Sequence, residues 1–285
     1  LPSFICRDLL ASVAAAGAQP VFYEVGPDLS PSQDSSRWPQ ANAALAVHYF
    51  GFPQDLAPFD AYARRTGAVV IEDAAHALFS RDAAGRLLGT SAKLAILSLR
   101  KSLPLPNGAA LLVNDVSMLP KLAAQIPFAD PCGVRPALKA AARPLLSSIG
   151  ARAAHSSLSL LRSWRGPAAP DTASERLLPA PDEPCVELAC PLACADPGLE
   201  AKRRRALWNW CDKLARNSGL EPIFKSLPAQ TVPYGYALRV SDFQKTAAVF
   251  SASGLRLLPW PDLPSAVAAG CPNHYRHTAL VHFLW

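Results

Sequence analysis

Residues 67–77 read Gly-Ala-Val-Val-Ile-Glu-Asp-Ala-Ala-His-Ala, an apolar run that ends in two acids and is followed by a histidine. A second apolar run, residues 94–97, leads into residues 98–101, Ser-Leu-Arg-Lys. Each run has the length and composition of a strand buried in a parallel sheet. Because the carboxyl ends of parallel strands face the ligand crevice of an α/β protein, we expect Asp73 and Lys101 to emerge at the same edge.

An acid and a lysine in one crevice predict a pyridoxal phosphate site. The lysine forms a Schiff base with this cofactor, and the carboxylate keeps the pyridine nitrogen protonated so that the ring acts as an electron sink. Two alternatives remain open: Asp73 caps the following helix, or Lys101 is a solvated loop lysine in a protein that has lost catalysis. Lys93 precedes the second strand and would emerge at the opposite edge.

The composition is that of a globular protein, with 50% hydrophobic and 18% charged residues over 285 positions. The net charge of +6 would permit an anionic ligand, but the basic residues do not alternate with aromatic ones, so we do not expect nucleic-acid binding. The densest basic run, residues 202–205, is interpreted as the exposed face of a helix start. No apolar stretch approaches the roughly 20 residues that cross a bilayer, so we expect no membrane contact.

The seven cysteines are scattered, without a Cys-x-x-Cys pair and without histidines at metal-ligand spacing. This distribution indicates free thiols in a cytoplasmic protein, and we expect no metal site.

Strands and helices are expected to alternate in the first part of the chain. The patterns predict helices at 8–17 and 55–66, and strands at 20–25, 44–49, 69–72, 94–99 and 109–113. Such alternation is typical of βαβ units on a mostly parallel sheet with helices on both faces. The last two strands are too close in sequence for a crossover helix, which predicts that they are antiparallel.

Three regions follow from these patterns. Residues 1–126 are predicted to form a large cofactor-binding domain, and residues 127–197 a helical excursion with a proline-rich linker. Residues 198–285 are predicted to form a small α+β domain, with helices at 199–217 and 242–252 and strands at 234–240, 255–258 and 279–284.

Several blocks of sequence resemble, in content and in order, the DegT/StrS-type family of sugar aminotransferases, which has the fold-type I aspartate aminotransferase architecture. The blocks are residues 16–22, 47–53, 70–77, 89–90, 98–101 and 107–111, and in the small domain residues 203–205, 232–234 and the strand before His282. The resemblance implies that Asp73 contacts the pyridine nitrogen, His76 the ring oxygen, Ser98 the phosphate, and that Lys101 forms the Schiff base. A packed histidine in the first turn of a helix is the alternative for His76.

The resemblance further implies transfer of an amino group from an amino acid to a keto sugar, usually nucleotide-linked, in sugar or cell-envelope biosynthesis, by a homodimer. Two departures favour a catalytically degenerate homologue with a binding or assembly role. The gap from Ser98 to Lys101 is shorter than usual, and the phosphate-binding turn near the amino terminus of the family is not found, so we expect a fragment lacking that segment. A related dehydratase would carry His in place of the lysine, and Lys101 argues against it.

Overall fold

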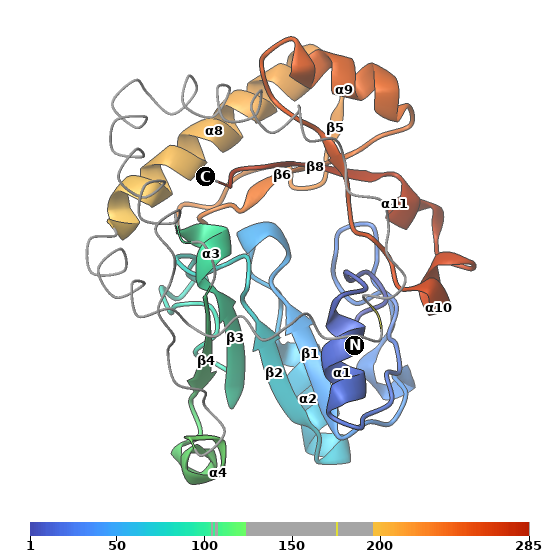
Figure 1. Ribbon diagram of the computed structural model, residues 1–285, viewed down its shortest axis with the longest axis vertical. Helices are drawn as coiled ribbons and strands as arrows, with labels where there is room; N and C mark the ends of the chain where they lie inside the picture. Colours follow the sequence, from blue (N-terminus) through green and yellow to red (C-terminus); the bar gives the residue numbers. More distant parts are fainter. Residues whose placement is uncertain (104, 106–107, 124–174, 176–195, 285) are drawn as a thin grey trace.

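The computed structural model of the chain describes residues 1–103, 105, 108–123, 175 and 196–284. These residues form two four-stranded sheets, with the strand orders β1-β2-β3-β4 and β5-β6-β8-β7. The second sheet and its helices lie across the upper end of the first sheet, at the edge where β3 leads into α3 (Figure 1). The carboxyl ends of the parallel strands therefore face the second sheet.

The first sheet is mostly parallel, as predicted. β1 (Ala43–Val47), β2 (Val69–Asp73) and β3 (Leu94–Ser98) are parallel, and β4 (Ala109–Val113) is antiparallel to β3. The register pairs Val47 with Asp73, and Asp73 with Ile96. The ends of β1, β2 and β3 are thus nearly level, which brings the residues that follow them to one edge.

Helix α2 (Ala57–Thr66) connects β1 to β2, and local sequence fixes both of its ends. A proline lies in its first turn, where the absent N–H is not needed. Gly67 ends it in the left-handed conformation, with φ 76° and its N–H donating to the carbonyl of Ala63 at 2.8 Å. The chain then enters β2 directly.

The prediction of a strand at residues 20–25 is wrong. Tyr23 and Val25 are buried, and Glu24 between them is exposed. They form only isolated bridges, to Pro2 and Pro31 respectively. The backbone N–H of Val25 donates to the Tyr275 hydroxyl at 2.9 Å instead of extending the bridge at Tyr23 into a ladder.

The second sheet and its helices form the small α+β part. Its elements are α8 (Pro197–Asn217), β5 (Glu221–Pro222), β6 (Gly235–Arg239), α9 (Phe243–Ser251), β7 (Leu258–Pro259), α10 (Ser265–Ala268), α11 (Asn273–Arg276) and β8 (Thr278–His282). All of its strand pairs are antiparallel. Asp196 and Asp242 cap α8 and α9, each accepting a backbone N–H at 3.0 Å.

The remaining elements are short and lie in the first part of the chain. They are α1 (Leu9–Ala15), α3 (Leu99–Ser102), α4 (Leu119–Ala123) and the 3-10 helices Ser35–Arg37, Tyr49–Gly51 and Val116–Met118. The helical excursion predicted at 127–197 lies outside the described residues except for residues 175, 196 and 197. No helix among the described residues combines the length and the apolar character that crossing a membrane requires.

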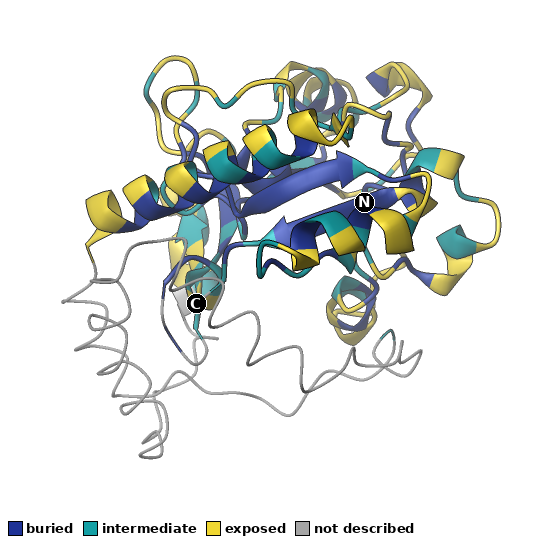
Figure 2. Cartoon of the chain, turned by 90° about the horizontal axis from the view of Figure 1, so that it is seen from above, coloured by how far each residue is buried: buried dark blue, intermediate teal, exposed yellow. Residues whose placement is uncertain are grey.

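One hydrophobic cluster includes residues of both parts of the chain. Phe52, after β1, stacks on Phe224 of the small part with ring centroids 3.7 Å apart. Trp260 of the small part meets Phe50 edge-on at 4.7 Å. Strands β1, β6 and β8 are largely buried, whereas β4, β5 and β7 contain no buried residue (Figure 2). Packing of aromatic side chains thus fixes the small part over the carboxyl edge of the first sheet.

Candidate active site

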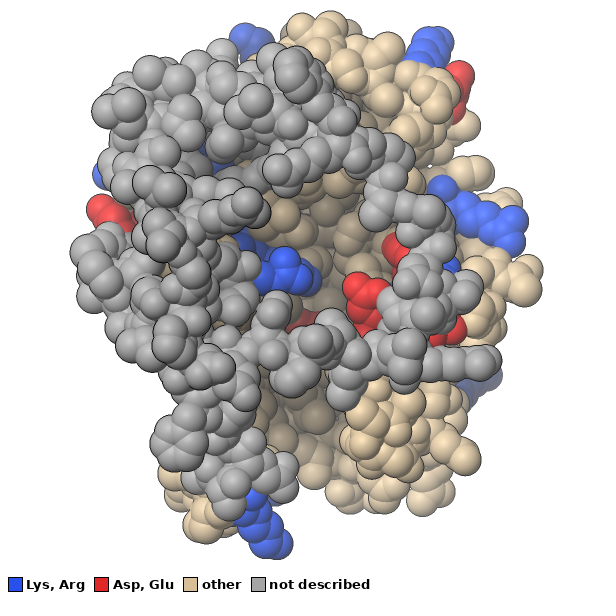
Figure 3. Space-filling view, viewed as in Figure 1, with Lys and Arg blue, Asp and Glu red and all other residues tan. Residues whose placement is uncertain are grey.

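The four residues expected at the cofactor site all belong to the carboxyl edge of the first sheet. Asp73 is the last residue of β2, Ser98 is the last residue of β3, and Lys101 lies in the single turn of α3. His76 follows β2 by three residues. This edge faces the small part (Figure 1). On the side of the molecule seen in Figure 3, basic and acidic side chains lie on opposite sides of a central hollow.

Lys101 is half-buried and its ammonium group contacts His76. The distance from Lys101 Nζ to His76 Nε2 is 3.2 Å, and Nζ lies 5.9 Å from the centre of the Tyr234 ring. Burial lowers the pKa of Lys101, the negative charge of Asp73 opposes this shift, and smaller contributions come from Cys6, Arg100 and Asp8. A lysine with a lowered pKa is a better nucleophile near neutral pH, because more of it is the free amine.

His76 is buried in a stack of rings. Its imidazole lies parallel to the Tyr234 ring, with centroids 4.0 Å apart and planes 5° apart, and to the Phe50 ring at 5.9 Å. Burial lowers the pKa of His76 well below its usual value, and the charges of Lys101 and Arg204 lower it further. The imidazole is therefore neutral at pH 7, so that Nε2 can accept a hydrogen from the Lys101 ammonium.

Asp73 and Ser98 have looser surroundings. Asp73 Oδ1 accepts the backbone N–H of Ala75 at 3.0 Å, but the segment that follows is a turn and not the helix that the capping alternative required. The carboxylate also interacts electrostatically with Lys101. Ser98 is half-buried at the N-cap of α3 and its side chain makes no capping hydrogen bond there. The structure thus links Asp73, His76 and Lys101, and it shows no contact from the Ser98 hydroxyl to them.

A buried carboxylate holds β2 beneath this site. Glu72, which is 1% exposed, accepts His48 Nε2 at 2.8 Å and the backbone N–H groups of Gly89, Ser91 and Ala92 at 2.9, 2.8 and 2.6 Å. Burial by itself raises the pKa of Glu72, but the hydrogen bonds outweigh it and the net shift is downward. Glu72 therefore stays ionised and fixes the loop before β3.

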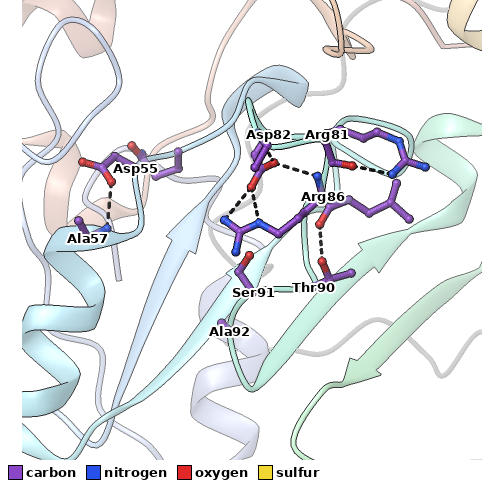
Figure 4. A network of polar contacts seen from close by, with 12 residues as sticks. Asp55, Ala57, Arg81, Asp82, Arg86, Thr90, Ser91 and Ala92 are labelled. Atoms are coloured by element: carbon purple, nitrogen blue, oxygen red, sulfur yellow. Dashed lines mark hydrogen bonds and ion pairs between the residues drawn. The ribbon is translucent and has the colours of Figure 1, made fainter.

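The same loop carries a second, more exposed carboxylate. Asp82 accepts the N–H groups of Ala84 and Arg86 and pairs with the Arg86 guanidinium at 2.8 Å (Figure 4). No dashed line joins this network to Ser91 or Ala92 in Figure 4, and the backbone N–H groups of these two residues donate to Glu72. Two acids thus organise different parts of one loop.

The basic run at 202–205 differs from the expectation. Arg203 and Arg204 are buried rather than exposed, and both pair with Glu200 at 2.7 and 2.5 Å. The guanidinium of Arg204 also donates to the backbone carbonyl of Lys101 at 2.6 Å. The one sequence signal for this burial was Glu200, which precedes the two arginines by three and four residues. On a helix this spacing permits ion pairs on one face.

Residues 9–130 match the model of the DegT/DnrJ/EryC1/StrS aminotransferase family, so this part of the chain is similar to that family. The pleiotropic regulatory protein of Geobacillus stearothermophilus is 32% identical over 117 residues, which are 39% of this chain and 31% of that protein. The matched region thus spans less than a third of the relative's length.

Solved structures are similar over almost the whole chain. A DegT DnrJ EryC1 StrS aminotransferase from Brucella abortus superposes with a TM-score of 0.61 at 18% identity, covering 99% of this chain and 73% of that one. DesI, solved in the presence of its TDP-sugar product, has a TM-score of 0.63 at 16% identity, covering 99% and 68%. The chain therefore has the fold of these aminotransferases, the fold-type I architecture, as predicted.

The side chains at the carboxyl edge fit pyridoxal phosphate in their chemistry. The amine of Lys101 has the lowered pKa that suits attack on an aldehyde, and Asp73 offers a carboxylate for the ring nitrogen. His76 offers a neutral imidazole for the ring oxygen, and Ser98 a hydroxyl at a helix start for the phosphate. Among the described residues, no group of three or more potential ligands gathers to hold a metal ion.

Proposed function

We propose that the chain is part of a pyridoxal phosphate-dependent aminotransferase that transfers an amino group from an amino acid to a keto sugar. One observation carries this proposal: the Lys101 amine, with its lowered pKa, lies 3.2 Å from the neutral imidazole of His76 at the same sheet edge as Asp73. The fold supports it, because the structures that the chain resembles are aminotransferases.

The roles of the residues follow from their charges and contacts. When bound, pyridoxal phosphate withdraws electrons from the donor's α-carbon and makes its hydrogen acidic. Asp73 would hold a proton on the ring nitrogen, and Ser98 would bind a phosphate oxygen. Lys101 would bind the cofactor and then, as a free amine, take a proton from the donor and return it at a neighbouring atom. His76 Nε2 accepts the hydrogen of Lys101 and orients Nζ.

The proposal extends to substrates, assembly and location. We infer that the acceptor is nucleotide-linked, because DesI was solved with a TDP-sugar product, and that the product enters sugar or cell-envelope biosynthesis. We infer a homodimer because the family resemblance implies one. A cytoplasmic location agrees with the free thiols of Cys6, Cys211 and Cys271 among the described residues.

Reductive labelling tests the proposal. The natural full-length protein is incubated with pyridoxal phosphate and cyanoborohydride, which leave a stable pyridoxyl group on a reactive lysine, and the labelled peptide is identified by mass spectrometry. We expect the label on Lys101 and its loss in Lys101→Ala. Lys93→Ala is the matched control, since Lys93 is exposed at the amino end of β3 and pairs with Asp115 at 3.3 Å.

The same experiment judges the alternative of a catalytically degenerate homologue. The ring stack that encloses His76, together with the short gap from Ser98 to Lys101, is the observation that favours it. Absence of label from every lysine would support a binding or assembly role and overturn the proposed aminotransferase function. Label on a different lysine would overturn the assignment of Lys101.

A further inference from the structure

Arg204 is a fully buried arginine that joins the small part of the chain to the lysine turn. Its side chain is 1% exposed, and its Nε donates to Glu200 Oε1 at 2.5 Å. Nη2 donates to the carbonyl of Lys101 at 2.6 Å, and Nη1 to the carbonyl of Pro233 at 3.4 Å. One rigid guanidinium thus bridges α8, the lysine turn and the segment that precedes Tyr234.

The bond to Lys101 satisfies a carbonyl that α3 itself leaves unused. A helix leaves its last carbonyls without partners, and α3 is a single turn, closed among the described residues by the bond from the N–H of Leu103 to the carbonyl of Leu99 at 2.7 Å. One turn gains little stability of its own. The position of Lys101 therefore depends on a contact from outside the helix, and Arg204 supplies it.

The hydrogen bond from Arg204 to the Pro233 carbonyl lies close to His76, the other partner in the contact with Lys101. Pro233 precedes Tyr234, whose ring lies 4.0 Å from the His76 ring, and His76 Nε2 contacts Lys101 Nζ. Arg204 therefore bonds to the backbone of Lys101 and to the backbone next to the ring that covers His76. Glu200, which it shares with Arg203, offsets part of its charge in this buried position.

We propose that Arg204 is a positioning residue for the reacting lysine. By bridging the carbonyls of Lys101 and Pro233, it sets the distance between the Lys101 amine and His76 and keeps the amine in its enclosed place. The inference rests on the proposed function, since it concerns the lysine that would bind pyridoxal phosphate.

The test compares three variants of the full-length protein by the pH dependence of pyridoxyl labelling at Lys101. Arg204→Gln removes the bridge. Arg204→Lys keeps the positive charge beside Glu200 but lacks the planar guanidinium that donates to both carbonyls. Arg205→Gln is the matched control, because Arg205 lies next to it on α8 and donates to the carbonyls of Pro228 and Thr231, each at 2.7 Å, instead of to Lys101. Thermal unfolding establishes that each variant is folded.

We expect Lys101 to become more solvated without the bridge, so that its pKa rises toward the ordinary value. Labelling near pH 7.5 should then fall about tenfold in Arg204→Gln, which is equivalent to about one pKa unit. Arg204→Lys should fall about threefold, and Arg205→Gln should keep the wild-type pH profile. A purely structural role would lower the unfolding temperature without moving this profile.

The outcomes separate the two proposals. If the wild type takes no label at Lys101, the proposed function fails. If the wild type is labelled and both Arg204 variants keep its pH profile, only the positioning role is overturned. Should Arg204→Gln not fold, Arg204→Lys alone decides: a shifted profile supports the role, and an unchanged one refutes it.

Discussion

Glu72 is the buried carboxylate on which the carboxyl edge of β2 depends, and we predict that Glu72→Gln destabilises the protein strongly. Its Oε1 accepts the N–H groups of Ser91 and Ala92, and its Oε2 accepts Gly89 N–H and His48 Nε2. The backbone N–H of Gln54 donates to Nδ1 of the same imidazole at 3.0 Å, so the hydrogen is on Nε2 and points at the carboxylate. Glutamine would keep one acceptor and turn an NH₂ group toward two donors.

The magnitude follows from the bonds that are lost. Two charge-assisted hydrogen bonds at about 1.5–3 kcal/mol each give about 3–6 kcal/mol, and we expect a loss of about 4 kcal/mol after local relaxation. For a chain of this size that loss corresponds to a fall in unfolding temperature of about 12 °C.

Thermal unfolding at pH 7, followed by circular dichroism, measures this loss. Asp82→Asn is the matched control, because Asp82 also accepts backbone N–H groups of the same loop but is far more exposed to water. The difference in unfolding temperature between the wild type and Glu72→Gln should have its full size above pH 4.5, the ordinary pKa of the carboxyl. Because the pKa of Glu72 is lowered in the folded state, the difference should vanish as the pH falls through that lowered value. An unfolding temperature for Glu72→Gln equal to that of Asp82→Asn would refute this reasoning.

Two further changes test the site and the contact between the two parts of the chain. Asp73→Asn should lower the pKa of Lys101, since the Asp73 charge raises it, and the pH profile of pyridoxyl labelling should move to lower pH; a shift to higher pH would contradict the interaction. Ser80→Ala should cost about 1–3 kcal/mol in denaturant unfolding, because the fully buried Ser80 Oγ accepts the N–H of Val232 at 2.9 Å and donates to its carbonyl at 3.2 Å. A loss no larger than that of an exposed serine, such as Ser117→Ala, would show that this bond is not needed.

Local pattern was enough to predict most of the first sheet. The apolar runs before Asp73 and before Ser98 became β2 and β3, and the short connection after Lys101 gave the antiparallel pair with β4. The same method failed at residues 20–25, where Tyr23 and Val25 are buried on either side of the exposed Glu24 but form only isolated bridges. Burial alone does not make a strand, because a strand also needs a partner that pairs with it along its length, and the Val25 N–H bonds to the Tyr275 hydroxyl instead.

The sequence alone determined the fold class, the order of most elements and the edge at which Asp73, Ser98 and Lys101 emerge, because these depend on strand length, side-chain polarity and short connections. Only the tertiary structure decided that His76 contacts Lys101 inside a ring stack and that Arg204 binds the lysine turn. Those contacts join residues far apart in the chain. The sequence of the run at 202–205 is the same whether its arginines face water or a buried glutamate. Only the packing of α8 in the tertiary structure shows that Arg204 pairs with Glu200.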